Sequence, residues 1–153
     1  MNMRLFGTDG VRGRAGVPPL DVRSIRRLGG ALVKALPAES EAPHLLIGRD
    51  TRESGEWIER DLALGATSHG AAVTSAGIIS TPAIAYLTRG QGFTAGVVIS
   101  ASHNPFHDNG IKVFSGAGEK FTEALEAEVE AIVADASWLE PQGDAPAVPQ
   151  VDL

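Results

Sequence analysis

Short apolar runs that alternate with longer amphipathic segments constrain the fold of this 153-residue chain more than any other feature. The apolar runs have the length of strands, whereas the amphipathic segments repeat apolar residues with the period of a helix. Neither kind of segment can bury its apolar surface alone, so their alternation predicts strands packed between helices. We therefore expect an α/β fold: a three-layer sandwich with a mixed, mostly parallel sheet of about four main strands, flanked by helices.

Residue patterns place these elements along the chain. The main strands are expected at His44–Ile47, Ala71–Ala76, Phe93–Ser100 and Ile111–Phe114, with a further short run at Arg4–Phe6. The helices are expected at residues 22–36, 55–69, 81–89 and 122–135, with Asp21, Ser54 and Thr81 as the caps of the first three. Asn109-Gly110 is a turn signal between the last two strands, which predicts that these strands run antiparallel.

The periodic pattern stops at Ser137. Beyond it the chain is punctuated by Pro141, Gly143, Pro146 and Pro149, a composition typical of linkers and loose ends. We therefore expect a folded domain over residues 1–136 and a linker or disordered tail over residues 137–153.

Composition excludes several classes of protein. The chain has no cysteine, which excludes disulfides, thiolate metal sites and cysteine catalysis. The net charge of −6 disfavours a general nucleic-acid binder, which needs a basic face. No apolar run approaches the roughly 20 residues that span a bilayer, and the first seven residues lack a signal-peptide core. We expect a cytoplasmic protein with no nucleic-acid or membrane partner.

Four polar, glycine-containing loops follow the expected strands. In open α/β sheets, ligands bind in the crevice outside the carboxyl ends of the strands, so these loops are expected to meet there. The loops are Gly7–Gly16, Gly48–Gly55, Ser75–Thr81 and Ser100–Gly110.

The most informative loop begins Ser100-Ala101-Ser102-His103-Asn104-Pro105, directly after the most apolar strand. A nucleophilic or phosphoryl-carrying serine needs a rigid support, because its oxygen must be held in place, and Ser102 has one beside the imidazole of His103. The alternative is structural: Ser102 and Asn104 satisfy backbone groups in a turn before Pro105.

His103 and His107 are four residues apart, a spacing that could bind zinc on a helix. Pro105 lies between them, and Asn104 stands where a metalloprotease has glutamate, so we reject a zinc site. His107 is expected to be a surface histidine.

Two basic residues are candidates for the crevice. Strand alternation places Lys112 on the face opposite Ile111 and Val113, where it either faces solvent or neutralises developing negative charge. Arg12, within Gly7–Gly13, either forms a loop ion pair or donates two hydrogen bonds to a phosphate. Its loop matches neither the Walker nor the dinucleotide pattern.

The segment Gly48-Arg49-Asp50-Thr51-Arg52 also carries adjacent opposite charges. We expect these charges to pair with one another and to brace the floor of the crevice, a structural role.

Three motifs carry a resemblance to a known family. They are Phe6-Gly7-Thr8-Asp9-Gly10-Val11-Arg12-Gly13, Gly48-Arg49-Asp50-Thr51-Arg52, and Ser100-Ala101-Ser102-His103-Asn104-Pro105 with Asn109-Gly110-Ile111-Lys112. Over about residues 3–136 the chain resembles the first domain of the α-D-phosphohexomutase superfamily. The opening motif is similar to that of the branch that acts on glucosamine phosphates.

The resemblance implies an isomerase that interconverts glucosamine 6-phosphate and glucosamine 1-phosphate, on the route to the cell-wall precursor UDP-N-acetylglucosamine. It implies that Ser102 is a phosphoserine that donates its phosphoryl group to the sugar, giving a bisphosphate intermediate. It implies Mg²⁺ as cofactor, with Ser102 among its ligands. Arg12 and Lys112 would bind the transferred phosphate of the phosphosugar substrate, and His103 would orient or exchange protons near the serine.

Members of the superfamily have four domains, and this chain resembles only the first. We therefore expect the chain alone to be inactive as a mutase, with the remaining domains as its partners, and expect that it could self-associate through an exposed interface. Two alternatives stay open. One is the first domain of a phosphomannomutase/phosphoglucomutase, and the other is a non-catalytic domain that binds phosphate or a protein.

Overall fold

The computed structural model describes residues 5–37 and 41–151. Within them, one mixed sheet of five strands has the order β1-β5-β4-β2-β3. The strands are β1 (Val11–Arg14), β2 (His44–Arg49), β3 (Ala72–Ile78), β4 (Ala95–Ile99) and β5 (Asp108–Ser115). The helices are α1 (Val22–Ala35), α2 (Ser54–Thr67), α3 (Thr81–Gly90) and α4 (Glu123–Ala134).

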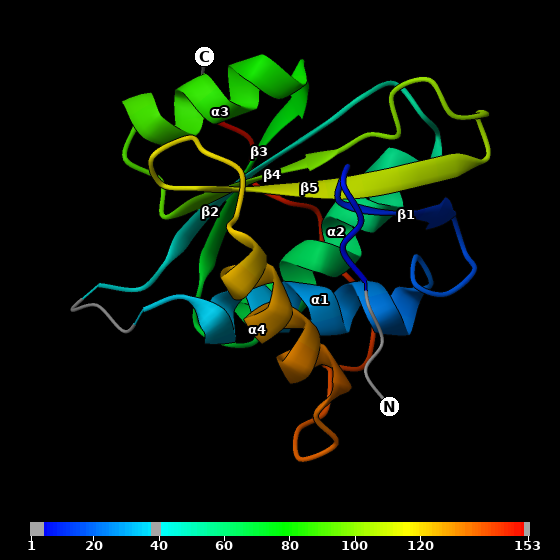
Figure 1. The fold of residues 1–153 in the computed structure, drawn as a ribbon, viewed down its shortest axis with the longest axis vertical. Helices are drawn as coiled ribbons and strands as arrows, with labels where there is room; N and C mark the ends of the chain where they lie inside the picture. The colour runs from blue at the N-terminus through cyan, green and yellow to red at the C-terminus, as the bar shows by residue number, and fades with distance from the viewer. Residues whose placement is uncertain (1–4, 38–40, 152–153) are drawn as a thin grey trace.

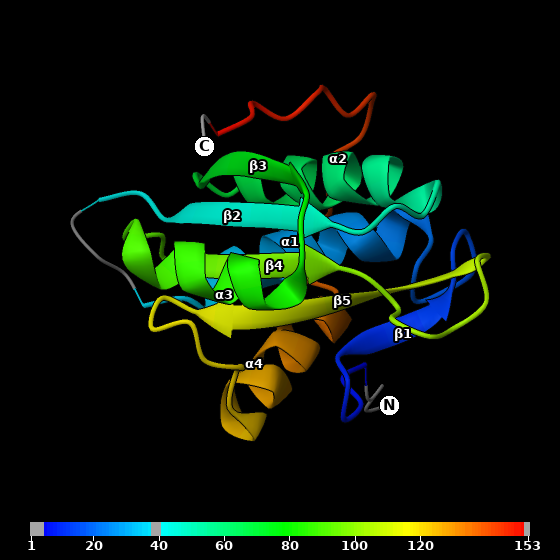
Figure 2. The ribbon, with the colours of Figure 1, turned by 90° about the horizontal axis from the view of Figure 1, so that it is seen from above.

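The helices form two layers around the sheet. α1, α2 and α4 cover one face and α3 lies on the other, as Figures 1 and 2 show. The larger apolar core lies on the side of α1, α2 and α4, and a smaller cluster around Leu46, Ile84 and Val98 lies under α3. β4 is buried along its whole length, because both of its faces are covered. The predicted α/β sandwich with a mixed sheet is confirmed.

The sheet differs from the prediction in strand number. β2 runs parallel to β3 and β4, and β5 runs antiparallel to both β4 and β1. Four of the five strands therefore run in one direction and β5 alone is reversed, as expected for a mixed, mostly parallel sheet. The additional strand, β1, lies inside the segment 7–16 that we expected to be a loop.

The reason for the missed strand is its position at the sheet edge. Val11 is buried opposite Ile111, but the residues after Val11 are glycine and arginine, which give no alternating apolar signal. The expected short strand at Arg4–Phe6 is wrong for Leu5 and Phe6, which form no strand. Arg4 lies outside the described residues.

The hairpin between β4 and β5 confirms the predicted antiparallel pair but not its turn. Asn109 and Gly110 lie within β5 and pair with Gly13 and Arg12, so the chain reverses earlier, between Ser100 and His107. The Asn109 side chain is fully buried, which explains why this pair does not form an exposed turn.

Two helix caps lie one residue earlier than predicted. α2 begins at Ser54 itself, with Glu53 in the cap position. The cap of α3 is Ser80, whose hydroxyl accepts a hydrogen bond from the Ala83 amide. Asp21 occupies the predicted cap of α1, but its side chain makes no capping hydrogen bond within the described residues.

Residues 137–151 contain no helix or strand, yet they contact the domain. The amide of Val151 donates to the Ser75 carbonyl at the edge of β3, 2.8 Å away. Nearer their start, Arg26 donates to the carbonyls of Pro141 and Gly143, and its Nε donates to Asp61. Residues 137–151 thus contact the domain at several points, and the expected linker or disordered tail over residues 137–153 stays a prediction.

Arg27 of α1 joins the end of α4 to the start of this segment. Its guanidinium donates to the carbonyls of Val133, Asp135 and Trp138 at 2.7–3.1 Å and lies 4.2 Å from the centroid of a Trp138 ring. Glu140 lies beside it, 3.6 Å from Nη1, and is buried. A charged donor that satisfies several carbonyls stabilises an irregular segment that has no backbone ladder of its own.

The contribution of Glu140 to stability depends on pH. Burial by itself raises the pKa of the Glu140 carboxyl group, but the hydrogen bond from Arg23 and the nearby charge of Arg27 outweigh it, so the pKa is lowered. Because the ionised form is favoured in the folded state, Glu140 stabilises the fold at neutral pH. This contribution is lost as the pH falls through the lowered pKa.

We expect Arg27→Met to lower the free energy of unfolding by about 2–3 kcal/mol, because three carbonyls lose a charged donor. Arg60→Met is the matched control: among residues 5–37 and 41–151, Arg60 forms an ion pair only with the exposed Glu56 one turn away, so the variant should change stability by less than about 0.5 kcal/mol. Urea unfolding of both variants measures the difference. Equal losses would mean that the contacts of Arg27 contribute nothing specific.

Candidate functional site

The loop between β4 and β5, residues 100–107, is named the serine loop. It lies beside the segment that follows β2, because β2 and β4 are parallel neighbours and their carboxyl ends meet. An open cleft of about 1120 Å³ lies between these segments. Its lining includes Arg14, Asp50, Arg52, Trp57, Ser100, Ser102, Asn104 and His107. Residues of three of the four expected loops, Gly7–Gly16, Gly48–Gly55 and Ser100–Gly110, thus line one cleft.

Ser102 is exposed and has a left-handed backbone conformation, with φ of 51°. Its amide donates to the Ser100 hydroxyl at 3.2 Å, and the Asn104 amide donates to the Ala101 carbonyl at 3.0 Å. Among the described residues, the Ser102 hydroxyl itself has no hydrogen-bond partner. The turn is therefore held by Ser100 and the backbone, and the Ser102 hydroxyl is left accessible at the cleft.

The segment 48–52 braces the cleft, but not only by internal pairing. The predicted internal pair exists between Asp50 and Arg52, whose Nε lies 3.2 Å from Oδ2. Arg49 instead pairs with Glu59 of α2 at 3.0 Å, and the Ser75 hydroxyl also donates to Glu59. Arg52 also contacts the serine loop, which adjacent charges in the sequence could not indicate.

Glu59 is buried, and its burial raises the pKa of its carboxyl group, although the Ser75 hydrogen bond and Arg49 oppose the change. A buried carboxylate is tolerated here because two donors face it. The pair fixes the end of β2 to α2, and so fixes the point from which Asp50 and Arg52 extend.

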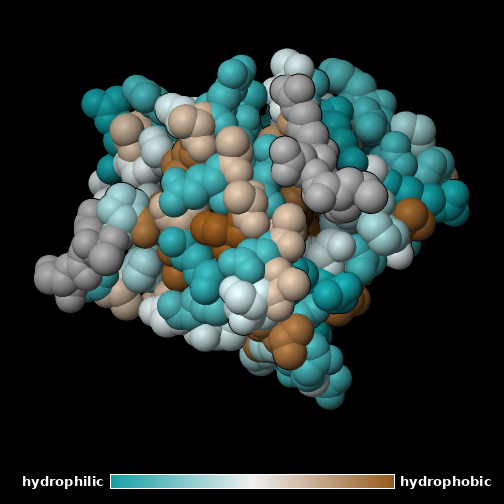
Figure 3. Space-filling view, turned by 60° about the horizontal axis from the view of Figure 1, so that its bottom comes forward, coloured by the Kyte–Doolittle hydropathy of each residue, from teal (hydrophilic) through white to brown (hydrophobic). Residues whose placement is uncertain are grey.

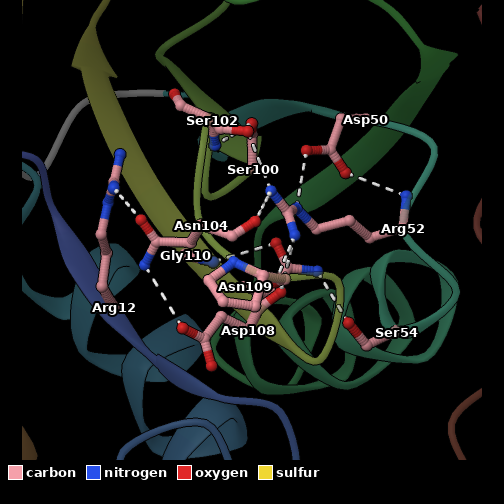
Figure 4. Close-up of polar contacts among 11 residues, drawn as sticks. Arg12, Asp50, Arg52, Ser54, Ser100, Ser102, Asn104, Asp108, Asn109 and Gly110 are labelled. Atoms are coloured by element: carbon pink, nitrogen blue, oxygen red, sulfur yellow. Dashed lines mark hydrogen bonds and ion pairs between the residues drawn. The ribbon is translucent and has the colours of Figure 1, made fainter.

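Arg12 reaches the serine loop from β1. Its Nη1 donates to the side-chain oxygen of Asn104 at 3.1 Å, and the side-chain nitrogen of Asn104 donates to the Asp108 carboxylate at 3.4 Å (Figure 4). Within residues 5–37 and 41–151, no ion pair joins Arg12 to Asp9, so the loop ion pair that the sequence left open does not form there.

Lys112 lies on β5 opposite Val98, on the α3 side of the sheet, while Ile111 and Val113 face the main core. The predicted alternation is therefore confirmed. Lys112 is partly exposed and lines a smaller cavity of about 190 Å³ with Thr8, Asp9, Gly10, Thr81 and Lys120. The chain thus places Ser102 and Lys112 along separate cavities around the same hairpin.

His103 and His107 both lie on the serine loop, not on a helix, and both are exposed. His107 is a surface residue, as predicted, and lies 3.5 Å from Asp108 at the edge of the cleft. His103 does not line that cleft.

The two ends of the serine loop pack closely together. Asn109 donates to the Ser54 hydroxyl of α2 at 2.9 Å and accepts from the Gly110 amide. A Cβ atom at Gly110 would lie 2.7 Å from the Ser100 carbonyl oxygen and 3.1 Å from the Cγ of Arg12. Gly110 therefore allows the two ends of the loop, and β1 beside them, to approach one another.

A family model described as "Phosphoglucomutase/phosphomannomutase, alpha/beta/alpha domain I" matches residues 3–140. The chain belongs to this phosphohexomutase family. Among curated relatives, the phosphoglucosamine mutase of Koribacter versatilis is 48% identical over 149 residues, covering 95% of this chain and 32% of the relative. That of Solibacter usitatus is 52% identical over 126 residues, covering 82% and 28%.

Solved phosphohexomutase structures share the fold. A protein from Thermus thermophilus assigned as a phosphomannomutase superposes with a TM-score of 0.81 at 25% identity, over 99% of this chain and 34% of that protein. The Paramecium phosphoglucomutase parafusin has a TM-score of 0.75 at 21% identity, over 92% of this chain and 26% of that protein. The chain therefore spans about a third of the length of the relatives it matches.

Sequence reasoning missed the roles of three residues that shape this candidate site. It interprets Asn109 as a turn residue, Ser54 as a cap, and Arg52 as an internal partner of Asp50 alone. All three contact residues about 50 positions away in the chain. No local pattern could have indicated these contacts, because the burial of Asn109 appears only in the folded chain.

We expect Gly110→Ala to lower the free energy of unfolding by about 1–3 kcal/mol, because the added methyl group overlaps the Ser100 carbonyl. Gly90→Ala is the matched control: a Cβ there meets no atom within 4 Å, so stability should not fall. Thermal unfolding compares the two variants. A Gly110→Ala variant as stable as the control would contradict the packing described for the loop.

Proposed function

We propose that this chain is the phosphoserine-carrying domain of a phosphoglucosamine mutase, which interconverts glucosamine 6-phosphate and glucosamine 1-phosphate. The single observation that supports this most is Ser102: its hydroxyl is exposed at the cleft and has no partner in the described residues, while Ser100 holds the turn. A group that must carry and release a phosphoryl group needs this combination of rigid backbone and unengaged oxygen.

The glucosamine substrate is proposed from the relatives. Relatives named phosphoglucosamine mutase are 45–52% identical to this chain, whereas the matched structure assigned as a phosphomannomutase is 25% identical. A phosphomannomutase or phosphoglucomutase domain is the second candidate, supported by the name of the matching family model. Elements outside this chain would decide the sugar.

The proposed reaction transfers one phosphoryl group at a time. The bond between phosphorus and the Ser102 oxygen breaks as a sugar hydroxyl bonds to phosphorus and releases its proton, giving a sugar bisphosphate. The other phosphate of that bisphosphate then returns to Ser102. Such transfers depend on alignment and charge neutralisation more than on covalent help from the protein.

The other residues have supporting roles in this proposal. Arg12 and Lys112 neutralise charge on the phosphate as it moves, and both project from the same face of the sheet, because Arg12 pairs with Gly110, two residues before Lys112. His103 lies next to Ser102 in the exposed loop and orients the serine or exchanges the hydroxyl proton. We further propose a cytoplasmic enzyme, and among the described residues no helix is long and apolar enough to cross a membrane.

Magnesium fits this site only in part. Ser102 offers one oxygen ligand, but the Asp50 carboxylate is engaged by Arg52, and the described residues gather no group of three His, Cys, Asp or Glu side chains. Mg²⁺ prefers about six oxygens, so the other ligands would come from water, phosphate or further domains. Bound there, the ion would act as a Lewis acid toward the phosphoryl oxygens.

The proposal also includes protein partners for this chain. The remaining domains of a longer enzyme would close the open cleft and complete the sugar site. Self-association of the chain alone is a further expectation. On the face shown in Figure 3, however, hydrophobic side chains form small patches separated by hydrophilic ones, not one continuous apolar surface.

We expect Ser102→Ala to abolish mutase activity, because alanine has no oxygen to carry the phosphoryl group. The assay uses a chimera in which residues 3–140 of this chain replace the matching domain of the Koribacter versatilis enzyme. Ser137→Ala, in the exposed segment after α4, is the control and should keep full activity. The isolated chain should show no turnover, and a Ser102→Ala chimera with normal turnover would refute the assignment.

We expect Lys112→Met in the same chimera to reduce kcat about 10²–10³-fold, the loss typical of one electrostatic donor in a transition state. The methionine keeps much of the apolar stem, so KM and the melting temperature should change little. Lys34→Met, on α1 beside Trp138, is the control and should leave kcat unchanged. Unchanged kcat would mean that Lys112 only faces solvent, and a lowered melting temperature would mean that its role is structural.

A further inference from the structure

We propose that Arg52 is a positioning residue that holds the Ser102 loop in the conformation needed for phosphoryl transfer. The proposal rests on the proposed function for its catalytic consequence, but its structural part stands on contacts alone. Arg52 follows β2, whereas the serine loop follows β4, so the contact joins segments 50 residues apart.

The guanidinium group of Arg52 is fully occupied by the serine loop and by Asp50. Nη2 donates to the carbonyls of Ser102 and Asn104 at 2.9 and 3.0 Å, and Nη1 donates to those of Pro105 and Asp108 at 2.7 and 3.4 Å. Nε faces Asp50 Oδ2 at 3.2 Å, and only 10% of the side chain is exposed. A guanidinium has five N–H groups, and here each has an acceptor.

These contacts favour positioning over direct substrate binding. With all five N–H groups engaged and its charge paired with Asp50, Arg52 keeps no donor for a phosphate. Asp50 also accepts a hydrogen bond from the Arg52 amide at 3.0 Å, which fixes the start of the side chain as well as its end. The planar guanidinium therefore holds three carbonyls of the serine loop and the carbonyl of Asp108, the first residue of β5, in fixed positions.

The constraint acts on Ser102 through its backbone. Ser102 has φ of 51°, a conformation that residues with a side chain rarely adopt, so something must hold it. Arg52 donates to the Ser102 carbonyl oxygen from one side, while the Ser102 amide donates to the Ser100 hydroxyl. Figure 4 shows the resulting arrangement: the Ser102 carbonyl faces the guanidinium, and the side chain points away from it.

Positioning of this kind has a distinct kinetic signature. Arg52 touches the loop that carries the phosphoryl group and not the sugar, so its loss should lower kcat and leave KM nearly unchanged. Displacement of a reacting atom by about 1 Å can cost about 100-fold in rate. Lysine is a poor replacement, because one ammonium group cannot span four carbonyls in a plane.

The first experiment measures amide hydrogen exchange in this chain, which needs no mutase activity. Arg52→Met should speed exchange in residues 101–108 and leave α1 and α4 unchanged. Arg49→Met is the matched control from the same segment. Arg49 pairs with Glu59 of α2 and has no hydrogen bond or ion pair with the serine loop among the described residues. The Arg49→Met variant should therefore change amide exchange outside residues 101–108. If Arg52→Met leaves residues 101–108 unchanged, or loosens the whole domain equally, the positioning role is refuted.

The second experiment measures kinetics in the chimera described above. Arg52→Met and the milder Arg52→Lys should each lower kcat, the former about 100-fold, with KM within about twofold. A raised KM at normal kcat would overturn the proposal in favour of substrate binding. If the unsubstituted chimera is inactive, the proposed function fails, whereas the exchange experiment still decides whether Arg52 orders the serine loop.

Discussion

The antiparallel return of β5 beside β4 is the interaction on which the arrangement of this domain depends. Its register sets Ile99 opposite Ile111, so β5 extends three residues beyond the end of β4, and the serine loop connects the two strand ends. The same pairing makes β5 the template for β1, and thereby brings Arg12 to the loop. A parallel neighbour at this position would need a long crossover and could not present a short, rigid loop at the strand ends.

Arginine side chains stabilise the irregular parts of the molecule. Arg52 beside the serine loop and Arg27 at the end of α4 each donate to three or more backbone carbonyls, most of which lie outside helices and strands. Each also lies beside a carboxylate, so that its charge is balanced where it is screened from water. The planar guanidinium with five donors is suited to this task, and lysine is not.

The site in this chain is organised but open. The serine loop is held from one side by Arg52 and from the other by Arg12, while its cleft faces outward. Lys112 lies along a neighbouring cavity on the α3 side of the sheet. Since the chain spans about a third of its relatives' length, this openness agrees with the proposal that the domain supplies the phosphoryl carrier to a larger enzyme.

The alternation of strands and helices, the antiparallel last pair, the placement of Lys112 on the face opposite Ile111 and Val113, and the motif around Ser102 could all be predicted from the sequence. These features follow from periodicity and short motifs, which report geometry over a few neighbouring residues. The folded chain was needed to see that β1 is an edge strand, that Asn109 is buried, and that Arg52 binds the serine loop. Such features depend on contacts between segments far apart in the chain, and a local pattern carries no record of the partner that completes a hydrogen bond or covers an apolar residue.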